Sequence, residues 1–257
     1  MSLASHPDRR AIGNFAEALA RAAQLVGFVP TEPVWVRPAR EQGPAASLSE
    51  RWNARRRPWP GSATWRYLVH ERALPEIVIR AAIRQGQLRE GPHGSMWAAH
   101  ADGAGVVTGW EERGPDWRGF STGGAKILFR LGLADASRFC VTEAAIDAMS
   151  LAAFEGLREG SLYLSTGGGW SPATEGAIRV LAARPGAHLV AATDANSQGE
   201  TFADRLREIA AEAGCDWFRL TPPAEDWNEA LKEKGRKEKE RRDGRRDLPP
   251  ARRPRQG

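Results

Sequence analysis

Between residues 138 and 220, short apolar runs alternate with longer amphipathic segments, and this alternation limits the fold more than any other feature of the chain. The apolar runs predict strands, and the segments between them have the three- and four-residue spacing of helices. Strands that alternate with helices favour a parallel sheet with helices on both faces. We therefore expect an α/β unit over residues 135–232. Its strands are expected at Arg138–Thr142, Ser161–Ser165, His188–Thr193 and Trp217–Leu220, and its helices at Ala144–Phe154, Pro172–Ala183 and Phe202–Ala213.

Residues 64–134 are predicted to form a smaller α+β domain. Its helix begins near Pro75, which suits a first turn, and ends at Gly86. Two strand candidates, Ser95–Ala99 and Gly105–Glu111, are joined by turn-forming residues and favour a hairpin. The glycine-rich stretch 113–124 has no regular period and is predicted to be a loop, either a simple turn or a backbone that approaches phosphates. The apolar face of the helix is expected at Leu74, Ile77, Val78, Ala81 and Ala82.

Residues 1–63 are predicted to hold an amphipathic helix over 14–26 and an irregular arm rich in Pro, Arg and Trp. The arm either stacks on nucleic-acid bases or folds back onto the body. No apolar run reaches the roughly 18–20 residues of a membrane span, and the first ten residues lack a signal-peptide core, so we expect a cytoplasmic protein. Cys140 and Cys215 lie in apolar runs and are expected to be buried free thiols, which argues against zinc.

The positive charge is concentrated at the end of the chain. The formal net charge is +5, from 37 basic and 32 acidic residues. Residues 232–257 hold 12 Lys or Arg and 5 Asp or Glu, a surplus of +7, which leaves −2 for residues 1–231. The tail over 233–257 has no apolar periodicity, so we expect it to be disordered or to extend the preceding helix. It is either merely solvated or in contact with nucleic acid.

Acidic residues directly follow two of the predicted strands, Glu143 after the first and Asp194 after the third. Ligands of parallel sheets bind beyond the carboxyl ends of the strands, which lie about 5–10 Å apart for near neighbours. We expect both carboxylates to meet one divalent cation, Mg²⁺ or alternatively Mn²⁺, because these hard ions prefer oxygen ligands. Asn196 is expected to add a neutral oxygen. Asp147, one turn after Glu143, faces the same edge or acts only as a helix-start charge.

Two segments resemble motifs of the Toprim family. The run Phe-Cys-Val-Thr-Glu143, followed by a helix that bears Asp147, resembles its first motif. The run Val-Ala-Ala-Thr-Asp194-Ala-Asn196, with Gly199 after it, resembles its Asp-x-Asp motif. The resemblance covers about residues 135–232 and implies a Toprim, Rossmann-like parallel sheet.

A third segment, Asp226-Trp227-Asn228, is similar to the one that closes many plasmid-borne Toprim-like domains. From the sequence alone, Asp226 is also a candidate helix N-cap, with Glu229 three residues later. The stretch from Tyr67 to Ser121 resembles an uncharacterised domain that often precedes this subgroup in proteins of plasmids and other mobile elements. That resemblance implies no known activity for residues 64–134.

The Toprim resemblance implies roles for single residues. In that family the Glu handles proton transfer in phosphodiester chemistry, and the Asp-x-Asp pair binds magnesium. These roles pass to Glu143, with Asp147 beside it as a second catalytic candidate, and to Asp194. Asn196 stands where the family usually has its second Asp, and Ala144 where Gly is frequent. The carboxylate missing at Asn196 puts metal affinity, and hence turnover, in question.

The leading hypothesis is a magnesium-dependent enzyme of DNA replication that acts on single-stranded DNA by primase-like nucleotidyl transfer, or by nicking. Arg113, Arg118 and Lys126 are predicted to contact phosphates. A topoisomerase and a full primase are disfavoured, because the tyrosines are only Tyr67 and Tyr163 and two cysteines cannot build a zinc module. One alternative is a catalytically weak nucleic-acid-binding module. Another is a small-molecule enzyme, although the glycine turn of dinucleotide-binding sheets is lacking after the first strand.

Overall fold

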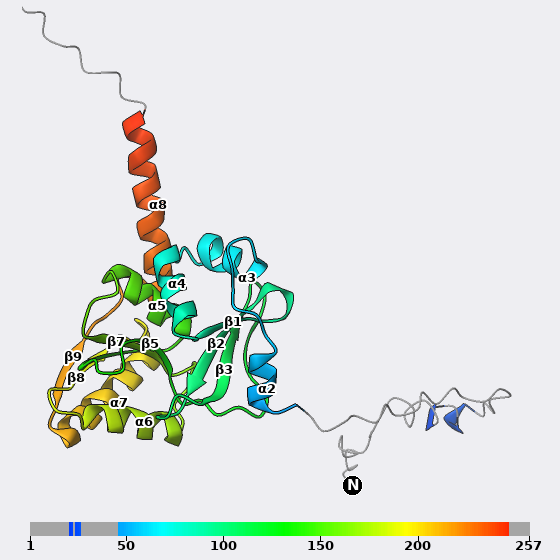
Figure 1. The fold of residues 1–257 in the computed structure, drawn as a ribbon, viewed down its shortest axis with the longest axis horizontal. Coiled ribbons are helices and arrows are strands. Elements are labelled where there is room, and N and C mark those ends of the chain that lie inside the picture. Colours follow the sequence, from blue (N-terminus) through cyan, green and yellow to red (C-terminus); the bar gives the residue numbers. More distant parts are fainter. Residues whose placement is uncertain (1–20, 23, 27–45, 247–257) are drawn as a thin grey trace, which may run out of the picture. The chain divides into compact units, whose positions relative to one another are not determined.

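The computed structural model describes residues 21–22, 24–26 and 46–246. The helix predicted over 14–26 therefore lies mostly outside the described residues, as does most of the arm before residue 46. The described residues from 46 to 246 belong to one compact unit that contains two β-sheets. Helices cover both sheets (Figure 1).

The first sheet is antiparallel. Its strands follow the chain in the order β1 (Leu88–Glu90), β2 (Met96–Ala101), β3 (Val107–Arg113) and β4 (Arg118–Phe120). The β2–β3 pair confirms the predicted hairpin. The loop predicted over 113–124 is wrong in part, because β4 pairs with β3 there. The chain reverses tightly between β3 and β4, where the Gly114 N–H donates to the Trp117 carbonyl. The three residues of β4 are too few to show the period of a strand.

Short helices precede and flank this sheet: α2 (Leu48–Asn53), α3 (Ala63–Arg66), the π-helix η1 (Tyr67–Glu71), α4 (Glu76–Arg84) and the 3₁₀ turn η2 (Pro92–Gly94). The predicted helix after Pro75 is confirmed as α4. Its buried face differs from the prediction, since Ile77 is 64% exposed and Ile79 is buried. The contact with the sheet is centred on the stripe that includes Val78, Ile79 and Ala82, so Ile77 points away from it.

The second sheet has the order β5-β7-β6-β8-β9. The strands β6, β7, β8 and β9 run parallel, as predicted. The edge strand β5 was not predicted, and it pairs antiparallel with β7, so the sheet is mixed. The sequence of β5, FRLG, contains an arginine and ends in glycine, so it forms no apolar run that would predict a strand. The bounds are β5 Phe129–Gly132, β6 Arg138–Thr142, β7 Ser161–Ser165, β8 His188–Ala191 and β9 Asp216–Arg219.

Four helices complete this unit: α5 (Ala145–Phe154), α6 (Pro172–Ala182), α7 (Ser197–Ala213) and α8 (Trp227–Arg246). One face of the second sheet shares a core with α4, α5 and the start of α8, and the other face packs against α6 and α7. Met96 and Ala98 of β2 belong to the first of these cores, so the two sheets are packed together. This arrangement confirms the predicted α/β class with a smaller α+β part before it.

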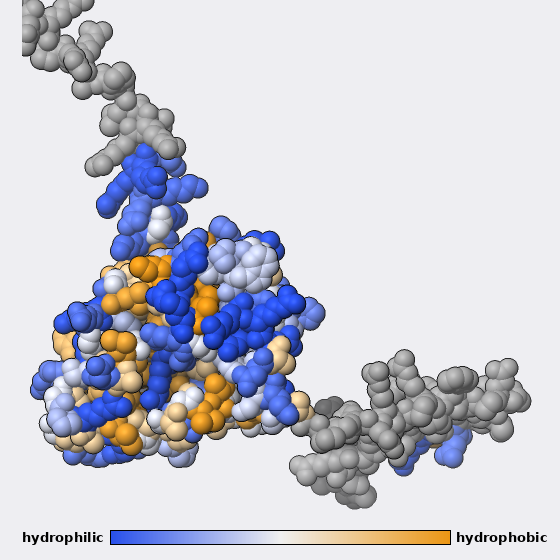
Figure 2. All heavy atoms as spheres, viewed as in Figure 1, coloured by the Kyte–Doolittle hydropathy of each residue, from blue (hydrophilic) through white to orange (hydrophobic). Residues whose placement is uncertain are grey.

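The basic tail continues α8 as a helix up to Arg246, and its side chains from Glu233 to Asp243 are exposed (Figures 1 and 2). Among the described residues, no helix has both the length and the apolar character that a bilayer span requires. Cys140 is a buried free thiol in β6. Cys215 is also free but only half-buried, because it lies in the turn before β9 rather than in a strand.

Candidate functional site

A cavity of about 360 Å³ lies at the carboxyl ends of β6 and β8. Side chains from both sheets and from the starts of α5, α7 and α8 line it. This is the edge at which the sequence predicted the acidic residues to meet. Its polar lining consists mainly of Arg72, Arg113, Arg118, Glu143, Asp147, Asp194, Asn196, Glu225, Asp226 and Asn228.

Glu143 and Asp194 are neighbours in this cavity. The Asp194 N–H donates to Glu143 Oε1 across 3.4 Å, and both residues are half-buried. Burial, followed by the negative charge of Glu143, raises the pKa of Asp194 to about 7. Burial also raises the pKa of Glu143. Asp194 Oδ1 is buried and has no hydrogen-bond partner among the described residues.

These donors fit a hard divalent cation. A buried, unpartnered carboxylate oxygen next to a second carboxylate is a favourable place for positive charge. Within residues 46–246, no three Asp, Glu, His or Cys side chains form a group arranged to hold a metal. Mg²⁺ keeps several waters and needs only one or two carboxylates, so Glu143 and Asp194 suffice.

The side chain of Asn196 has a structural role that the sequence prediction did not include. Asn196 is the N-cap residue of α7, and its Oδ1 accepts the Gly199 N–H at 2.9 Å. Asn196 lines the cavity, but its oxygen is already used at the helix start. Gly199 itself is required by close packing, because a Cβ there would lie 2.0 Å from the Asp194 carbonyl oxygen.

Asp147 is buried, with 6% of its surface exposed, in the first turn of α5. It accepts the Asn228 N–H at 3.1 Å and so joins α5 to the start of α8. Burial, together with the charges of Asp226 and Asp194, raises its pKa well above the usual value. The side chain of Asn228 donates to Ser150 Oγ and to the Arg72 carbonyl. These bonds fix Asn228, whose backbone N–H in turn fixes the buried Asp147 carboxylate.

Asp226 is the N-cap of α8, as the sequence predicted. Its Oδ1 accepts the Glu229 N–H at 2.7 Å, while the Glu229 carboxylate pairs with Lys232 instead of closing a capping box. Trp227, which lies between Asp226 and Asn228 in the sequence, is buried, and its Nε1 donates to the Ala192 carbonyl at 2.8 Å. The segment therefore ties α8 to the strand end that carries Asp194.

Two of the three predicted phosphate-binding residues lie in the cavity. Arg113 and Arg118 are paired neighbours on β3 and β4, and the charge of Arg113 acts on both Asp194 and Asp147. Lys126 is not among the lining residues. Its Nζ lies 5.4 Å from the centre of the Phe120 ring, and its carbonyl accepts from Ser171 and Thr174. The structure thus does not bring Lys126 to the cavity.

Arg219 was not predicted from the sequence, although it organises the loop that carries Asp194. From the end of β9, its guanidinium donates to the carbonyls of Ala191, Thr193, Asp194 and Leu220 and to the Glu200 carboxylate. A single arginine at a strand end carries no motif that would have revealed this contact. Its positive charge also partly opposes the rise in the Glu143 pKa.

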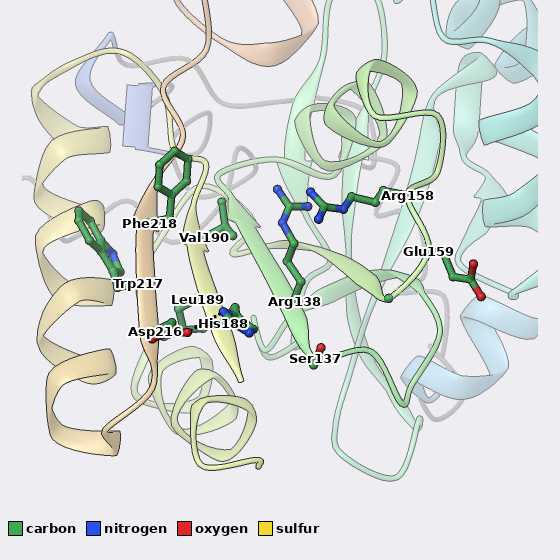
Figure 3. A pocket seen from close by; sticks show the side chains of 11 residues that line it. Ser137, Arg138, Arg158, Glu159, His188, Leu189, Val190, Asp216, Trp217 and Phe218 are labelled. Carbon is green, nitrogen blue, oxygen red and sulfur yellow. Dashed lines mark ion pairs between the residues drawn. The ribbon is translucent and has the colours of Figure 1, made fainter. Parts of the chain in front are cut away.

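A second cavity, of about 470 Å³, lies at the opposite, amino edge of the second sheet (Figure 3). Arg138 there is paired with Glu155 at 2.7 Å, and His188 with Asp216 at 3.0 Å. Its two carboxylates, Glu159 and Asp216, lie on opposite sides of it (Figure 3), whereas Glu143 and Asp194 adjoin each other at the carboxyl edge. The carboxyl edge is therefore the candidate site.

Two family models match the chain. The Toprim-like family matches residues 140–231, and a family described as a protein of unknown function, DUF3991, matches residues 66–136. No curated protein matches the chain.

The chain is similar to solved primase structures. The primase fragment of the bacteriophage T7 primase-helicase protein is 16% identical, with a TM-score of 0.46 over 66% of this chain and 70% of that chain. The Aquifex aeolicus primase, with its zinc-binding and RNA polymerase domains, is 16% identical, with a TM-score of 0.48 over 88% of this chain and 66% of that chain.

Proposed function

We propose, for a chain whose residues 140–231 form a Toprim-like domain, that the acidic cavity carries out divalent-metal-dependent phosphodiester chemistry on nucleic acid. One observation carries this proposal: Glu143 and Asp194 adjoin each other, and one buried carboxylate oxygen of Asp194 has no hydrogen-bond partner in the part of the chain that the structure describes. Two carboxylates that burial disfavours in their charged forms gain from a bound cation. The specific reaction we propose is primase-like nucleotidyl transfer on single-stranded DNA, with nicking as the alternative reaction.

Glu143 and Asp194 would hold a Mg²⁺ or Mn²⁺ ion, which supplies positive charge to a phosphoryl group. Glu143 is the residue we assign to proton transfer. Burial raises its pKa in the absence of the cation, and its carboxylate lines the cavity beside Asp194, where a phosphoryl group would lie. Asp147 is buried and bonded to the Asn228 N–H, so its role is to position α5 rather than to meet the substrate.

The arginines of the first sheet line the same cavity as the acids. Arg113 and Arg118 are cross-strand neighbours, so their side chains leave the sheet on the same face. Guanidinium groups bind phosphate oxygens through paired hydrogen bonds. In this proposal the residues of the DUF3991 match hold the nucleic-acid backbone while the Toprim-like acids hold the cation.

The test compares Glu143→Gln and Asp194→Asn with Asp204→Asn, an exposed acid of α7 that pairs only with Arg207 among the described residues. Mn²⁺ affinity is measured by calorimetry, and products by nucleotide incorporation on single-stranded DNA and by nicking of supercoiled plasmid. We expect Glu143→Gln to lose about 10²- to 10⁴-fold in product, the usual contribution of general acid–base catalysis. The Asp194→Asn variant should bind Mn²⁺ at least about tenfold more weakly, with the control unchanged. Full activity of Glu143→Gln would contradict the assignment.

A second candidate function is nucleic-acid binding without turnover. The observation that favours it is Asn196, whose oxygen caps α7 where the family usually supplies a second carboxylate. Binding of DNA by the wild-type protein with Mn²⁺ present, and no incorporation or nicking, would decide for this candidate. Asn196→Asp discriminates further, because Asp caps a helix equally well and restores the charge. A gain of product in that variant supports a metal site that Asn196 weakens.

A further inference from the structure

Glu111 is a buried acid of β3 that the mechanism above does not use. Only 2% of its surface is exposed. Its Oε1 accepts from Ser165 Oγ at 2.6 Å and from His100 Nε2 at 2.9 Å. Both oxygens also accept from the Ala145 N–H, with the shorter contact, 3.0 Å, at Oε2. A carboxylate from the first sheet is therefore bound to the backbone at the start of α5 and to the side chain of Ser165 in β7.

The Ala145 N–H belongs to the first residue of α5, the helix that directly follows Glu143. The first N–H groups of a helix need acceptors from outside the helix. The N-cap residue of α5, Ala144, has no side chain that can accept, and no side-chain cap is present there. Glu111 supplies the missing acceptor from a distant part of the chain, and its negative charge lies at the positive end of the helix dipole.

Ser165 extends the contact to Glu143 itself. Its hydroxyl lies 2.6 Å from Glu111 Oε1 and 3.1 Å from the Glu143 carbonyl oxygen, and it accepts the Gly167 N–H. The pKa of Glu111 is lowered: burial alone would raise it, but the hydrogen bond and charge of His100, with further bonds from Ser165 and Ala145, outweigh burial. The buried group is thus held as a carboxylate by fixed donors around it.

The same strand reaches the cavity two residues later. Side chains two apart on a strand share a face, so Glu111 and Arg113 both leave β3 towards the second sheet. One strand therefore provides both the cap of α5 and a cationic side chain of the cavity. The position of Arg113 relative to Glu143 therefore depends on this strand.

We propose that Glu111 is a positioning residue, through which the first sheet fixes the start of α5 and with it the orientation of Glu143. This inference rests on the proposed function, in which Glu143 is the reacting acid. It gives the residues of the DUF3991 match a defined part in the site: without β3, the helix that follows Glu143 begins without a cap.

The test variant is Glu111→Gln, and its matched control is Glu112→Gln. Glu112 is the next residue of β3, lies on the opposite face, and accepts from Ser95 Oγ. Three donors, from His100, Ala145 and Ser165, surround the Glu111 carboxylate. In Glu111→Gln an NH₂ group replaces one of its two oxygens, so at least one of these donors loses its bond to residue 111. Hydrogen exchange of the amides from 144 to 148 and Mn²⁺ affinity are measured in both variants.

We expect exchange at 144–148 to rise about two- to thirty-fold in Glu111→Gln, the range for a lost helix cap, with weaker Mn²⁺ binding. Glu112→Gln should change neither. A merely structural role for Glu111 would lower the melting temperature and raise exchange throughout the protein, without a local excess at 144–148. Equal exchange at 144–148 in the two variants, with equal Mn²⁺ affinity, overturns the proposal.

If Glu111→Gln does not fold, Glu111→Asp provides the same test, because the shorter side chain keeps the buried charge but draws the carboxylate back from the Ala145 N–H. A local rise in exchange at 144–148 supports the proposal, and no local change overturns it. If the wild-type protein binds no Mn²⁺, the proposed metal chemistry fails. The exchange data then still decide whether Glu111 fixes α5.

Discussion

Substitution of Gly199 by alanine tests how tightly α7 is packed against the loop of Asp194. Gly199 is the third residue of α7, and an added Cβ would lie 2.0 Å from the Asp194 carbonyl oxygen and 2.8 Å from its carbonyl carbon. A C–H···O contact needs about 3.3 Å, so the helix or the loop must move by about 1.3 Å. The obstacle is backbone, which cannot rotate away as a side chain does.

The expected magnitude combines two opposing effects. Alanine gains up to about 1 kcal/mol over glycine in a helix. Forcing extra volume into a packed place costs about 1–3 kcal/mol, and a clash with backbone belongs at the upper end. The free energy of unfolding should therefore fall by about 2 kcal/mol, which lowers the melting temperature by about 4–8 °C for a chain of this size. Because the moving atoms belong to Asp194, Mn²⁺ affinity should fall as well.

The matched control is Gly176→Ala in α6, where an added Cβ meets nothing within 4 Å. This variant should gain about 1 kcal/mol and melt about 2–4 °C higher. Both variants are measured by urea unfolding followed by circular dichroism, and by calorimetry with Mn²⁺. The reasoning is refuted if Gly199→Ala is as stable as the wild type and binds Mn²⁺ equally well.

Three further predictions concern the loop of Asp194, the protonation of Asp194 and the basic tail. Arg219→Lys should lower the free energy of unfolding by about 1–3 kcal/mol, because a lysine cannot reach the set of carbonyls that the guanidinium holds. The control, Arg207→Lys on the exposed face of α7, should change this free energy by less than about 0.5 kcal/mol. Urea titrations measure both variants. In EDTA, the stabilisation due to protonated Asp194 should be complete below about pH 4 and lost as the pH rises through about 7, because the pKa of Asp194 in the folded protein is raised above 3.8. The difference in the free energy of unfolding between wild type and Asp194→Asn should follow this course. A constant difference from pH 4 to 8 would contradict the prediction. Removal of residues 233–257, whose described side chains are exposed, should leave the melting temperature nearly unchanged. The slope of the logarithm of DNA affinity against the logarithm of salt concentration should fall by about 0.7–0.9 for each phosphate that the tail neutralises. An unchanged slope would show that the tail does not bind DNA.

The order of elements in the second sheet was predictable because each element is long enough to show its own period. The strands β6 and β7 were placed at their observed bounds, and the helices α5 and α6 within one residue at each end. The strands β4 and β5 were not predicted, since their sequences, RGF and FRLG, contain arginine and glycine and form no apolar run. Their pairing is decided by the neighbouring strand and not by their own residues.

The acidic pair was predictable for a similar reason. Glu143 and Asp194 each end a parallel strand, and parallel strands in register end at one edge, so their meeting follows from topology. The helix cap formed by Asn196 was not predictable, because only the tertiary structure places the Gly199 N–H against its oxygen. Cation binding by the same oxygen stays a prediction.

The sequence by itself determined the alternation of strands and helices, the edge at which the acids gather, and the basic end of the chain, because these depend on local period and composition. Tertiary structure alone decided that Arg219 binds the Asp194 loop and that Glu111 caps α5. In each case a charged side chain bonds to backbone groups far away in the chain. Backbone N–H and C=O groups are the same in every residue except proline, so such bonds leave no pattern in the amino-acid order.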